Sequence, residues 1–289
     1  MAVGVRQRWE RASMLAPGLL ALAGVTLFPG IYLLYMSVMG WTAFSPVVRF
    51  TGGDNFRTLL HSPSFWEAAG TTLLFVTLST GLSLLLGLAL ALALNEDLRG
   101  RGAMRTLLTL PLIVPPVVAG FGWKFLLSSD VGVIGAFLLP LAGIRVAPMG
   151  DPRLAMASVV LADIWSKTSF MFLITLAGLQ AIPPFLYEAA RIDGAGFWAQ
   201  LRLITLPLLK GVLIIAVILR VLDAINTFDV IFVMTQGGPG TATATFSILG
   251  WKIGFTYFDL GQAAALAVLM MLGAVFATNL LIRRTRLAG

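Results

Sequence analysis

Residues 70–94 read GTTLLFVTLSTGLSLLLGLALALAL, a stretch without a single charged side chain. A helix needs about 20 apolar residues to cross the roughly 30 Å of hydrocarbon in a bilayer, so this stretch is long enough to span a membrane. Two other long stretches also lack Asp, Glu, Lys and Arg, one between Arg11 and Arg49 and one between Asp259 and Arg283. The sequence therefore predicts an integral membrane protein.

The amino-acid composition also indicates a protein whose surroundings are lipid rather than water. The 289 residues are 58% hydrophobic and 11% charged, whereas a soluble domain carries about 25% charged residues. The absence of cysteine excludes disulfides and thiolate metal sites, and the single histidine, His61, excludes multi-histidine metal sites. We attribute the net charge of +7 to basic cytoplasmic loops rather than to nucleic-acid binding.

The apolar segments predict an all-α fold with six transmembrane helices in a single transmembrane domain over residues 1–289. The first segment is about twice as long as the core of a signal peptide, so we expect it to be retained as a span. The apolar piece 131–144 is too short to cross and contains Pro140, so we expect a surface or re-entrant helix there. The expected spans are about 13–38, 70–94, 106–128, 154–179, 204–234 and 260–282.

Basic residues orient these spans. With both termini in the cytoplasm, most Lys and Arg residues fall in cytoplasmic loops and tails, as the positive-inside rule requires. A seventh crossing would place the basic tail Arg283, Arg284 and Arg286 outside, which favours six. The basic residues left outside are Arg49, Arg57, Arg145, Arg153 and Lys252.

This topology places residues 188–207, EAARIDGAGFWAQLRLITLP, in the cytoplasmic loop between the fourth and fifth spans. Proline followed by good helix formers predicts a helix start, and Gly194 and Gly196 permit a turn before a second short helix. The resulting helix–turn–helix, 185–203, could dock another protein through its small residues and its carboxylate. It could equally lie on lipid headgroups as an amphipathic helix.

The spacing within this loop resembles that of a known family. Glu188-Ala189-Ala190, then Gly194, then Ile204, Leu206 and Pro207 match the EAA signature of permease subunits in bacterial ATP-binding-cassette (ABC) importers. The resemblance implies the type I ABC importer permease fold and makes this loop a coupling helix that docks on a separate ATPase. The residues implied in coupling are Glu188, Ala189, Ala190, Asp193, Gly194, Ile204, Leu206 and Pro207.

The segments 220–240, 165–180 and 54–66 resemble carbohydrate-uptake permeases of the MalF type. The resemblance implies that this chain is a multi-pass protein of the bacterial inner membrane. It also implies a second permease subunit in a heterodimer, two cytoplasmic ATPase subunits and an extracytoplasmic solute-binding protein. The partners expected are these proteins and membrane lipid, and no nucleic acid.

The chain has no phosphate-binding P-loop of its own. The motif G-x-x-x-x-G-K-[ST] places a lysine after a glycine, and none of the lysines, Lys124, Lys167, Lys210 and Lys252, follows one. We therefore expect a non-enzymatic subunit that binds no cofactor, with ATP and Mg²⁺ held by the partner ATPase.

Charged residues inside spans are costly, about 2.5–3.5 kcal/mol each, unless they are paired or face water. Asp163 and Lys167 stand four residues apart and Arg220 and Asp223 three apart, so each helix could neutralise its own charges. The alternative is that one face of the fifth span lines a polar solute pathway. The pathway candidates are Trp165, Lys167, Arg220, Asp223, Asn226, Phe228 and Asp229.

The cluster Pro111, Pro115 and Pro116 must interrupt the third span. Such a break either is a packing kink, which we favour, or lets backbone groups line a cavity.

The function expected from the sequence is ATP-driven, binding-protein-dependent import of a sugar, an oligosaccharide or a sugar-like solute. The alternatives are an anionic sugar derivative, such as glycerol phosphate or a sulfonated sugar, and an ion-driven secondary carrier.

Overall fold

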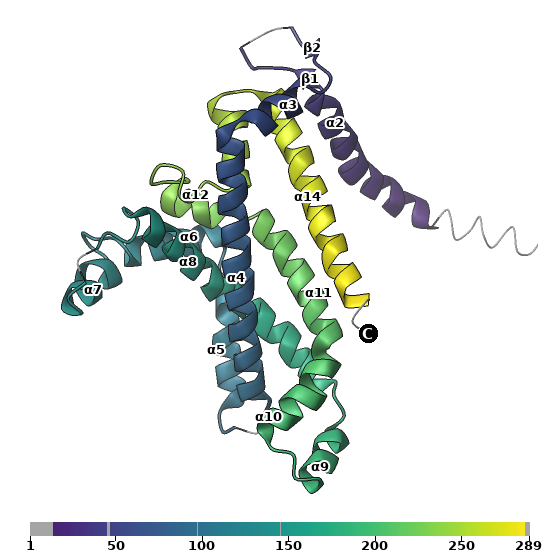
Figure 1. The fold of residues 1–289 in the computed structure, drawn as a ribbon, viewed down its shortest axis with the longest axis vertical. Coiled ribbons are helices and arrows are strands. Elements are labelled where there is room, and N and C mark those ends of the chain that lie inside the picture. Colours follow the sequence, from purple (N-terminus) through teal and green to yellow (C-terminus); the bar gives the residue numbers. More distant parts are fainter. Residues whose placement is uncertain (1–13, 45–46, 97, 145, 287–289) are drawn as a thin grey trace, which may run out of the picture. The chain divides into compact units, whose positions relative to one another are not determined.

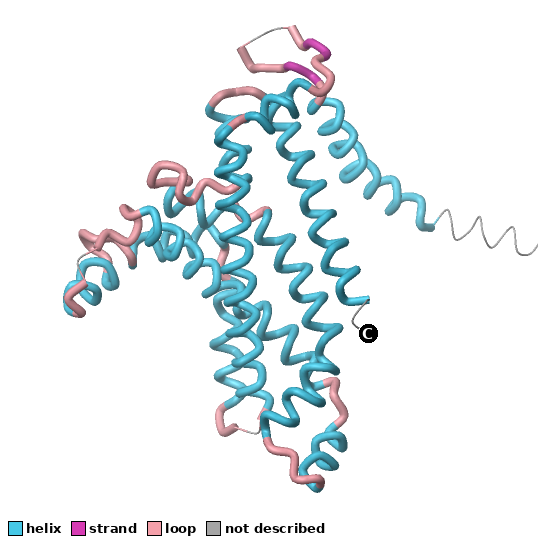
Figure 2. The backbone as a smooth tube through the Cα atoms, viewed as in Figure 1, coloured by secondary structure: helices cyan, strands magenta, loops and turns pink. Residues whose placement is uncertain are grey.

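The structure is a computed structural model that describes residues 14–44, 47–96, 98–144 and 146–286. Helices make up most of this described part of the chain, and its two short strands form one hairpin (Figure 2). Two compact units are present. One comprises residues 1–62 and 250–272, and the other comprises residues 63–249 and 273–289.

The first unit begins with the helix Met14–Ser37, which contains one wide π-helical turn, η1 (Ala23–Leu27), followed by α2 (Phe28–Ser37). Its other elements are β1 (Met39–Gly40), β2 (Arg49–Phe50), α3 (Asp54–His61), η4 (Lys252–Thr256) and the first half of α14 (Leu260–Arg286). The strands are antiparallel, with Met39 opposite Phe50.

Hydrogen bonds connect residues 37–41, at and just after the end of the first helix, to α3 and to the start of α14. The side-chain amide of Asn55 donates to the carbonyl oxygens of Ser37 and Met39, both at 2.9 Å. The amide of Leu260 donates to the Trp41 carbonyl at 3.0 Å. A Cβ atom at Gly261 would run into the Met39 carbonyl oxygen, so the close approach requires glycine here.

The second unit is built around α8 (Pro152–Gln180), which packs against α4, α5, α6, α11 and α12 (Figure 1). Its other elements are α4 (Pro63–Asn95), α5 (Arg101–Ile113), α6 (Pro116–Leu126), η2 (Val133–Leu138), α7 (Leu139–Leu141), α9 (Pro184–Ile192), α10 (Phe197–Gln200), η3 (Leu201–Thr205), α11 (Leu206–Ile225), α12 (Asp229–Thr235) and the start of α13 (Phe246–Trp251).

Glycines set the close packing of α8 on its neighbours. A Cβ atom at Gly87 of α4 would lie 2.8 Å from the Phe172 backbone nitrogen. A Cβ atom at Gly178 of α8 would lie 2.8 Å from a methyl carbon of Leu209 on α11. Since neither atom fits without a shift, the absence of a side chain is what allows these helices to approach so closely.

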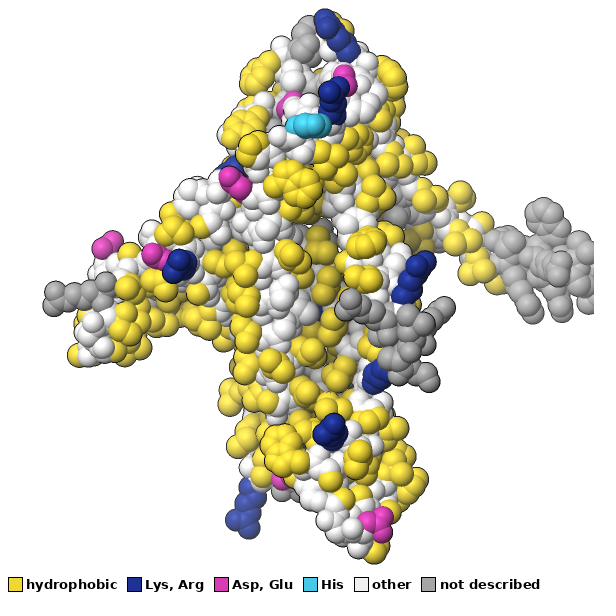
Figure 3. Space-filling model, viewed as in Figure 1, with side chains coloured by type: hydrophobic (Ala, Val, Ile, Leu, Met, Phe, Trp, Pro, Cys, Tyr) yellow, Lys and Arg dark blue, Asp and Glu magenta, His cyan; other side chains and the backbone are white. Residues whose placement is uncertain are grey.

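Four helices of the described chain are long and apolar enough to cross a membrane, namely Met14–Ser37, Pro63–Asn95, Pro152–Gln180 and Leu260–Arg283. Counting the bent pair α5 and α6 as one span gives five. On the face shown in Figure 3, hydrophobic side chains cover much of the surface, as expected of helices in lipid.

The predicted span 106–128 is divided into α5 and α6, which meet at a bend of 99°. Pro115 has no backbone N–H to donate to the carbonyl of Pro111, one turn earlier, so the helix cannot continue. The hydroxyl of Ser166 on α8 donates to the Pro111 carbonyl at 3.4 Å instead. The interruption that the prolines predicted is present, and a neighbouring helix satisfies the exposed backbone.

The predicted span 204–234 is also divided. α11 ends at Ile225 and α12 starts at Asp229, with Asn226, Thr227 and Phe228 between them. Because α11 carries Lys210, Arg220 and Asp223, length and apolarity alone do not identify it as a span. The piece 131–144 forms only the short helices η2 and α7.

Candidate functional sites

The first site is the segment from Pro183 to Pro207. α9 ends in a Schellman motif, in which the Ala195 amide donates to the Ala190 carbonyl at 2.8 Å and the Gly194 amide donates to Arg191 at 3.1 Å. Gly194 has a φ of +78°, in the left-handed region that favours glycine. The predicted turn is therefore present at Gly194, whereas Gly196, with a φ of −74°, adopts a conformation open to any residue.

The second helix of the segment does not end before Pro207. It runs without interruption from Phe197 through the π-helical turn η3 into α11. Pro207 has no N–H to donate to the preceding turn, and the wide turn places the Leu206 amide on the Leu201 carbonyl. The predicted helix–turn–helix 185–203 is therefore joined directly to α11.

The signature residues lie on the exposed side of this segment. Glu188, Ala189, Asp193 and Gly194 are exposed, and Ala190 is half-buried. Large apolar side chains accompany them, with Ile192 87% exposed and Trp198 77% exposed. Of the later signature residues, Ile204 and Leu206 are half-buried and Pro207 is exposed. A surface that combines carboxylates, small residues and exposed apolar groups is suited to contact with another protein.

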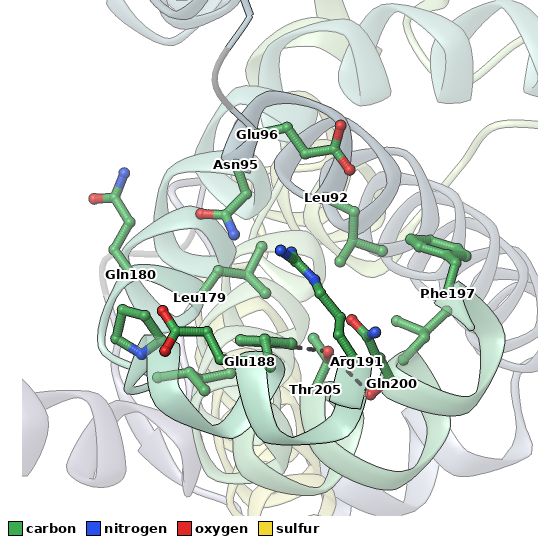
Figure 4. A pocket seen from close by; sticks show the side chains of 14 residues that line it. Leu92, Asn95, Glu96, Leu179, Gln180, Glu188, Arg191, Phe197, Gln200 and Thr205 are labelled. Atoms are coloured by element: carbon green, nitrogen blue, oxygen red, sulfur yellow. Dashed lines mark hydrogen bonds between the residues drawn. The ribbon is translucent and has the colours of Figure 1, made fainter. Parts of the chain in front are cut away.

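Behind the segment lies a pocket of about 580 Å³, between α9, η3 and the ends of α4 and α8. The Arg191 side chain extends into it toward Asn95, the last residue of α4, and Glu96, which follows it (Figure 4). The hydroxyls of Tyr187 and Thr205 share a hydrogen bond of 3.1 Å and connect α9 to η3. The pocket thus lies between α9 and the ends of α4 and α8.

The second site is a charge cluster inside the helix bundle, made of Ser79, Asp163, Lys167, Arg220 and Asp223. Arg220 is fully buried and Asp163 is 1% exposed. One guanidinium nitrogen, Nη2, donates to both Asp163 and Ser79, and the Ser79 hydroxyl donates to Asp163. These contacts connect α4, α8 and α11 through buried polar groups.

The outer half of the cluster is more accessible. The Asp223 carboxylate accepts a hydrogen bond from the other guanidinium nitrogen of Arg220, Nη1, at 2.8 Å. It also pairs with the Lys167 ammonium group at 3.0 Å. The side chains of Lys167 and Asp223 are 23% and 44% exposed. Asp223 is thus shared by two cations on two different helices.

One of the two pairings expected within a single helix is present and the other is wrong. Arg220 and Asp223 pair on α11 as expected, but Asp163 pairs with Arg220 and Lys167 pairs with Asp223. The guanidinium presents several donors in a planar fork, so it can bind two carboxylates at once and draws Asp163 into a contact between helices.

The remaining pathway candidates lie outside the cluster. Trp165 is 40% exposed and packs edge-on against Trp123. The Asn226 amide donates to the Leu222 carbonyl at 2.8 Å, and Phe228 stacks on Phe232. Asp229 is exposed in the first turn of α12. The single face expected from 220 to 229 is interrupted because α11 ends at Ile225.

Ser79 did not emerge from the sequence, because a serine in an apolar helix gives no signal of its partners. Asp163 was recognised as a charged residue but not as part of the site. Lys124, in the last turn of α6, donates to the Val233 carbonyl at 3.0 Å, close to the end of α12.

Comparison with known proteins identifies the family. Residues 83–285 match the model of the family described as the binding-protein-dependent transport system inner membrane component. The chain belongs to this family. This permease is therefore a multi-pass component of the inner membrane in an ABC importer, and its family is one of transport proteins rather than of enzymes.

Among its relatives is the trehalose/maltose transport system permease protein MalF of Thermococcus litoralis, 40% identical over 86% of this chain and 83% of that protein. Another is the sulfoquinovosyl glycerol transport system permease protein SmoG of Agrobacterium fabrum, 35% identical over 94% of this chain and 89% of that protein.

A similar solved structure is a bacterial alginate ABC transporter in complex with an alginate pentasaccharide-bound periplasmic protein. One of its chains is 25% identical, with a TM-score of 0.87 over 99% of this chain and 97% of its own.

Proposed function

We propose that this permease forms half of the solute pathway in an ATP-driven, binding-protein-dependent sugar importer. A second permease subunit, in a heterodimer, completes the pathway. Two separate ATPase subunits bind ATP and Mg²⁺ on the cytoplasmic side, and an extracytoplasmic binding protein delivers the solute. The presence of a periplasmic binding protein in the complex of the alginate transporter supports the last of these partners.

The exposed signature segment carries the proposal. Glu188 lies in the middle of α9 and Gly194 forms the turn that follows this helix. From the turn, α10 and η3 lead without a loop into α11. An ATPase that binds this surface would cover Glu188, Ala189, Ala190, Asp193 and Gly194, while Ile204, Leu206 and Pro207 would connect the contact to α11. A headgroup-bound helix would leave this carboxylate-bearing surface without a specific partner.

We further propose that six segments cross the membrane, with both termini in the cytoplasm. The bent pair of α5 and α6 is one crossing, and α11 is another. The charges of α11 are compatible with this because Arg220 and Asp223 bind side chains within the bundle rather than facing lipid.

The names of the relatives support a sugar as the solute. Trehalose and maltose are uncharged disaccharides, and the Thermococcus relative is named for both. An anionic sugar derivative is the second candidate, because the Agrobacterium relative is named for sulfoquinovosyl glycerol. The proposed pathway region comprises Trp165, Lys167, Arg220, Asp223, Asn226, Phe228 and Asp229.

Reconstitution of the whole importer tests the proposal. The permease is purified with the ATPase, the second permease and the binding protein encoded by neighbouring genes, and is placed in proteoliposomes. We expect solute-loaded binding protein to stimulate ATP hydrolysis and sugar uptake. The double variant Glu188→Ala, Gly194→Val should lose at least about tenfold of both, because it removes the charged anchor and the left-handed turn.

A matched control carries Glu67→Ala and Gly196→Ala. Glu67 is exposed in the second turn of α4, and Gly196 has an ordinary φ with open space around its Cα atom. This control should keep normal uptake and hydrolysis. Normal coupling in the Glu188→Ala, Gly194→Val variant would contradict the coupling role of the segment.

A further inference from the structure

In the proposed topology, the pair of Lys167 and Asp223 lies near the middle of the membrane, where lipid is most hostile to charge. Lys167 is near the middle of α8 (Pro152–Gln180), so it lies about 20 Å from either end of the helix. A charged side chain that faces hydrocarbon at this depth is strongly disfavoured. Both side chains are nevertheless partly exposed, Asp223 by 44%. Their exposed side must therefore face water or protein rather than lipid.

The cluster to which this pair belongs is electrically balanced. Its two cations are Lys167 and Arg220, and its two carboxylates are Asp163 and Asp223. Lys167 is bound to both oxygens of Asp223, at 3.0 and 3.1 Å, and Arg220 is bound to both carboxylates. Neither cation of the cluster has a positive charge to spare for an incoming anion.

The accessible groups are matched to hydroxyl groups. A carboxylate accepts hydrogen bonds at about four lone-pair positions, and an ammonium group has three donors. A solute hydroxyl both donates and accepts, so it can bind Asp223 and Lys167 without separating them. A phosphate or sulfonate would instead have to displace a carboxylate from a cation, which costs an existing ion pair.

We propose that Lys167 and Asp223 line the solute pathway and that the balanced cluster favours an uncharged, hydroxyl-rich solute over an anionic one. This inference rests on the proposed import function and decides between its two solute classes. Arg220 does not contact the solute. It is buried, and together with Asp163 and Ser79 it holds α4, α8 and α11 in place behind the exposed pair.

The chain contains no cysteine, so a single introduced cysteine is the only thiol of this subunit. Its reaction rates with neutral and charged thiol reagents report on the access of water-soluble molecules to that position and on the charge around it. In the purified importer, Asn226→Cys places a thiol one turn beyond Asp223 and leaves all four charges intact. Its rate of modification is measured with methanethiosulfonate reagents that carry a hydroxyethyl, a sulfonatoethyl or a trimethylammonioethyl group. Each rate is divided by the rate of the same reagent with a free thiol in solution. The sulfonate reagent carries the same charged group as a sulfonated sugar.

The control for access is Leu82→Cys on α4. Leu82 is 42% exposed and lies within one turn of Ser79, at a similar depth. It is apolar and should face lipid, which excludes charged reagents. We expect Asn226→Cys to react at least tenfold faster than Leu82→Cys with the hydroxyethyl reagent. The sulfonate reagent should show no advantage over the hydroxyethyl reagent at Asn226→Cys.

Two further variants change the net charge of the cluster. Asp223→Cys leaves one excess positive charge and should favour the sulfonate reagent by about tenfold, while Lys167→Cys should favour the cationic reagent by a similar factor.

The proposal is overturned if Asn226→Cys reacts no faster than Leu82→Cys, or if it favours the sulfonate reagent by tenfold in the intact cluster. Uptake by the same preparations tests the import function separately, so failure of transport with the expected labelling would count against that function alone.

Discussion

At the scale of single residues, Arg220 has the greatest influence on the bundle. Its guanidinium is fully buried and binds Asp163, Asp223 and Ser79 on three helices. Loss of one member of a buried ion pair leaves the other charge without compensation, which costs about 3–5 kcal/mol. The variant Arg220→Met should therefore unfold at a clearly lower temperature in detergent.

The double variant Arg220→Met, Asp163→Leu tests the cause of that loss. It removes both buried charges of the inner pair, and well-packed apolar replacements are often neutral or stabilising. We expect it to regain a large part of the stability lost in Arg220→Met. A double variant no more stable than Arg220→Met would show that shape, not charge, decides the effect.

At the scale of elements, the contact between α4 and α8 depends on Gly87. Alanine there would place its Cβ atom 2.5 Å from the Cβ atom of Met171 and 2.8 Å from the Phe172 backbone nitrogen, so the helices must separate. Overpacking of this kind costs about 1–3 kcal/mol. Gly81→Ala, on the same helix with open space around it, is the matched control and should be neutral or slightly stabilising. Thermal unfolding of both variants in detergent measures the difference, and equal stability would contradict the close contact.

The elements also show how far the sequence predicts the structure. The uncharged run 70–94 lies wholly within α4, because apolar length is sufficient to identify a helix in lipid. Pro115 predicted an interruption because it lacks a donor, but neither the 99° bend nor the contact of Ser166 on α8 with the Pro111 carbonyl could be predicted from the sequence. The end of α11 at Ile225 was missed, since no proline or glycine marks it.

The candidate sites also contain features that the sequence predicts and features that it does not. The turn at Gly194 follows from local backbone geometry, so its position could be predicted from the sequence. The cross-helix pairing of Asp163 with Arg220 could not, because spacing along one helix does not show which helix lies opposite. Ser79 became recognisable only when α4 was placed against these two residues.

At the scale of the whole molecule, the energy source separates an ABC importer from an ion-driven carrier. The chain belongs to a family of ABC importer permeases, so we expect uptake by the reconstituted importer to require ATP, which the partner ATPase would hydrolyse. Ionophores that collapse proton and sodium gradients should leave uptake unchanged. An importer assembled with an ATPase that lacks its P-loop lysine serves as the control and should be inactive. Uptake driven by an ion gradient without ATP would refute the import mechanism.

The unbroken helix from Phe197 to Ile225 has a mechanical consequence. It leads from the exposed turn at Gly194 to Asp223 without an intervening loop. The helix changes direction near η3 and Pro207, so α10 and α11 meet at an angle rather than forming one straight rod (Figure 1). A partner that moves α10 would therefore turn α11 through continuous helical backbone and carry Asp223 with it.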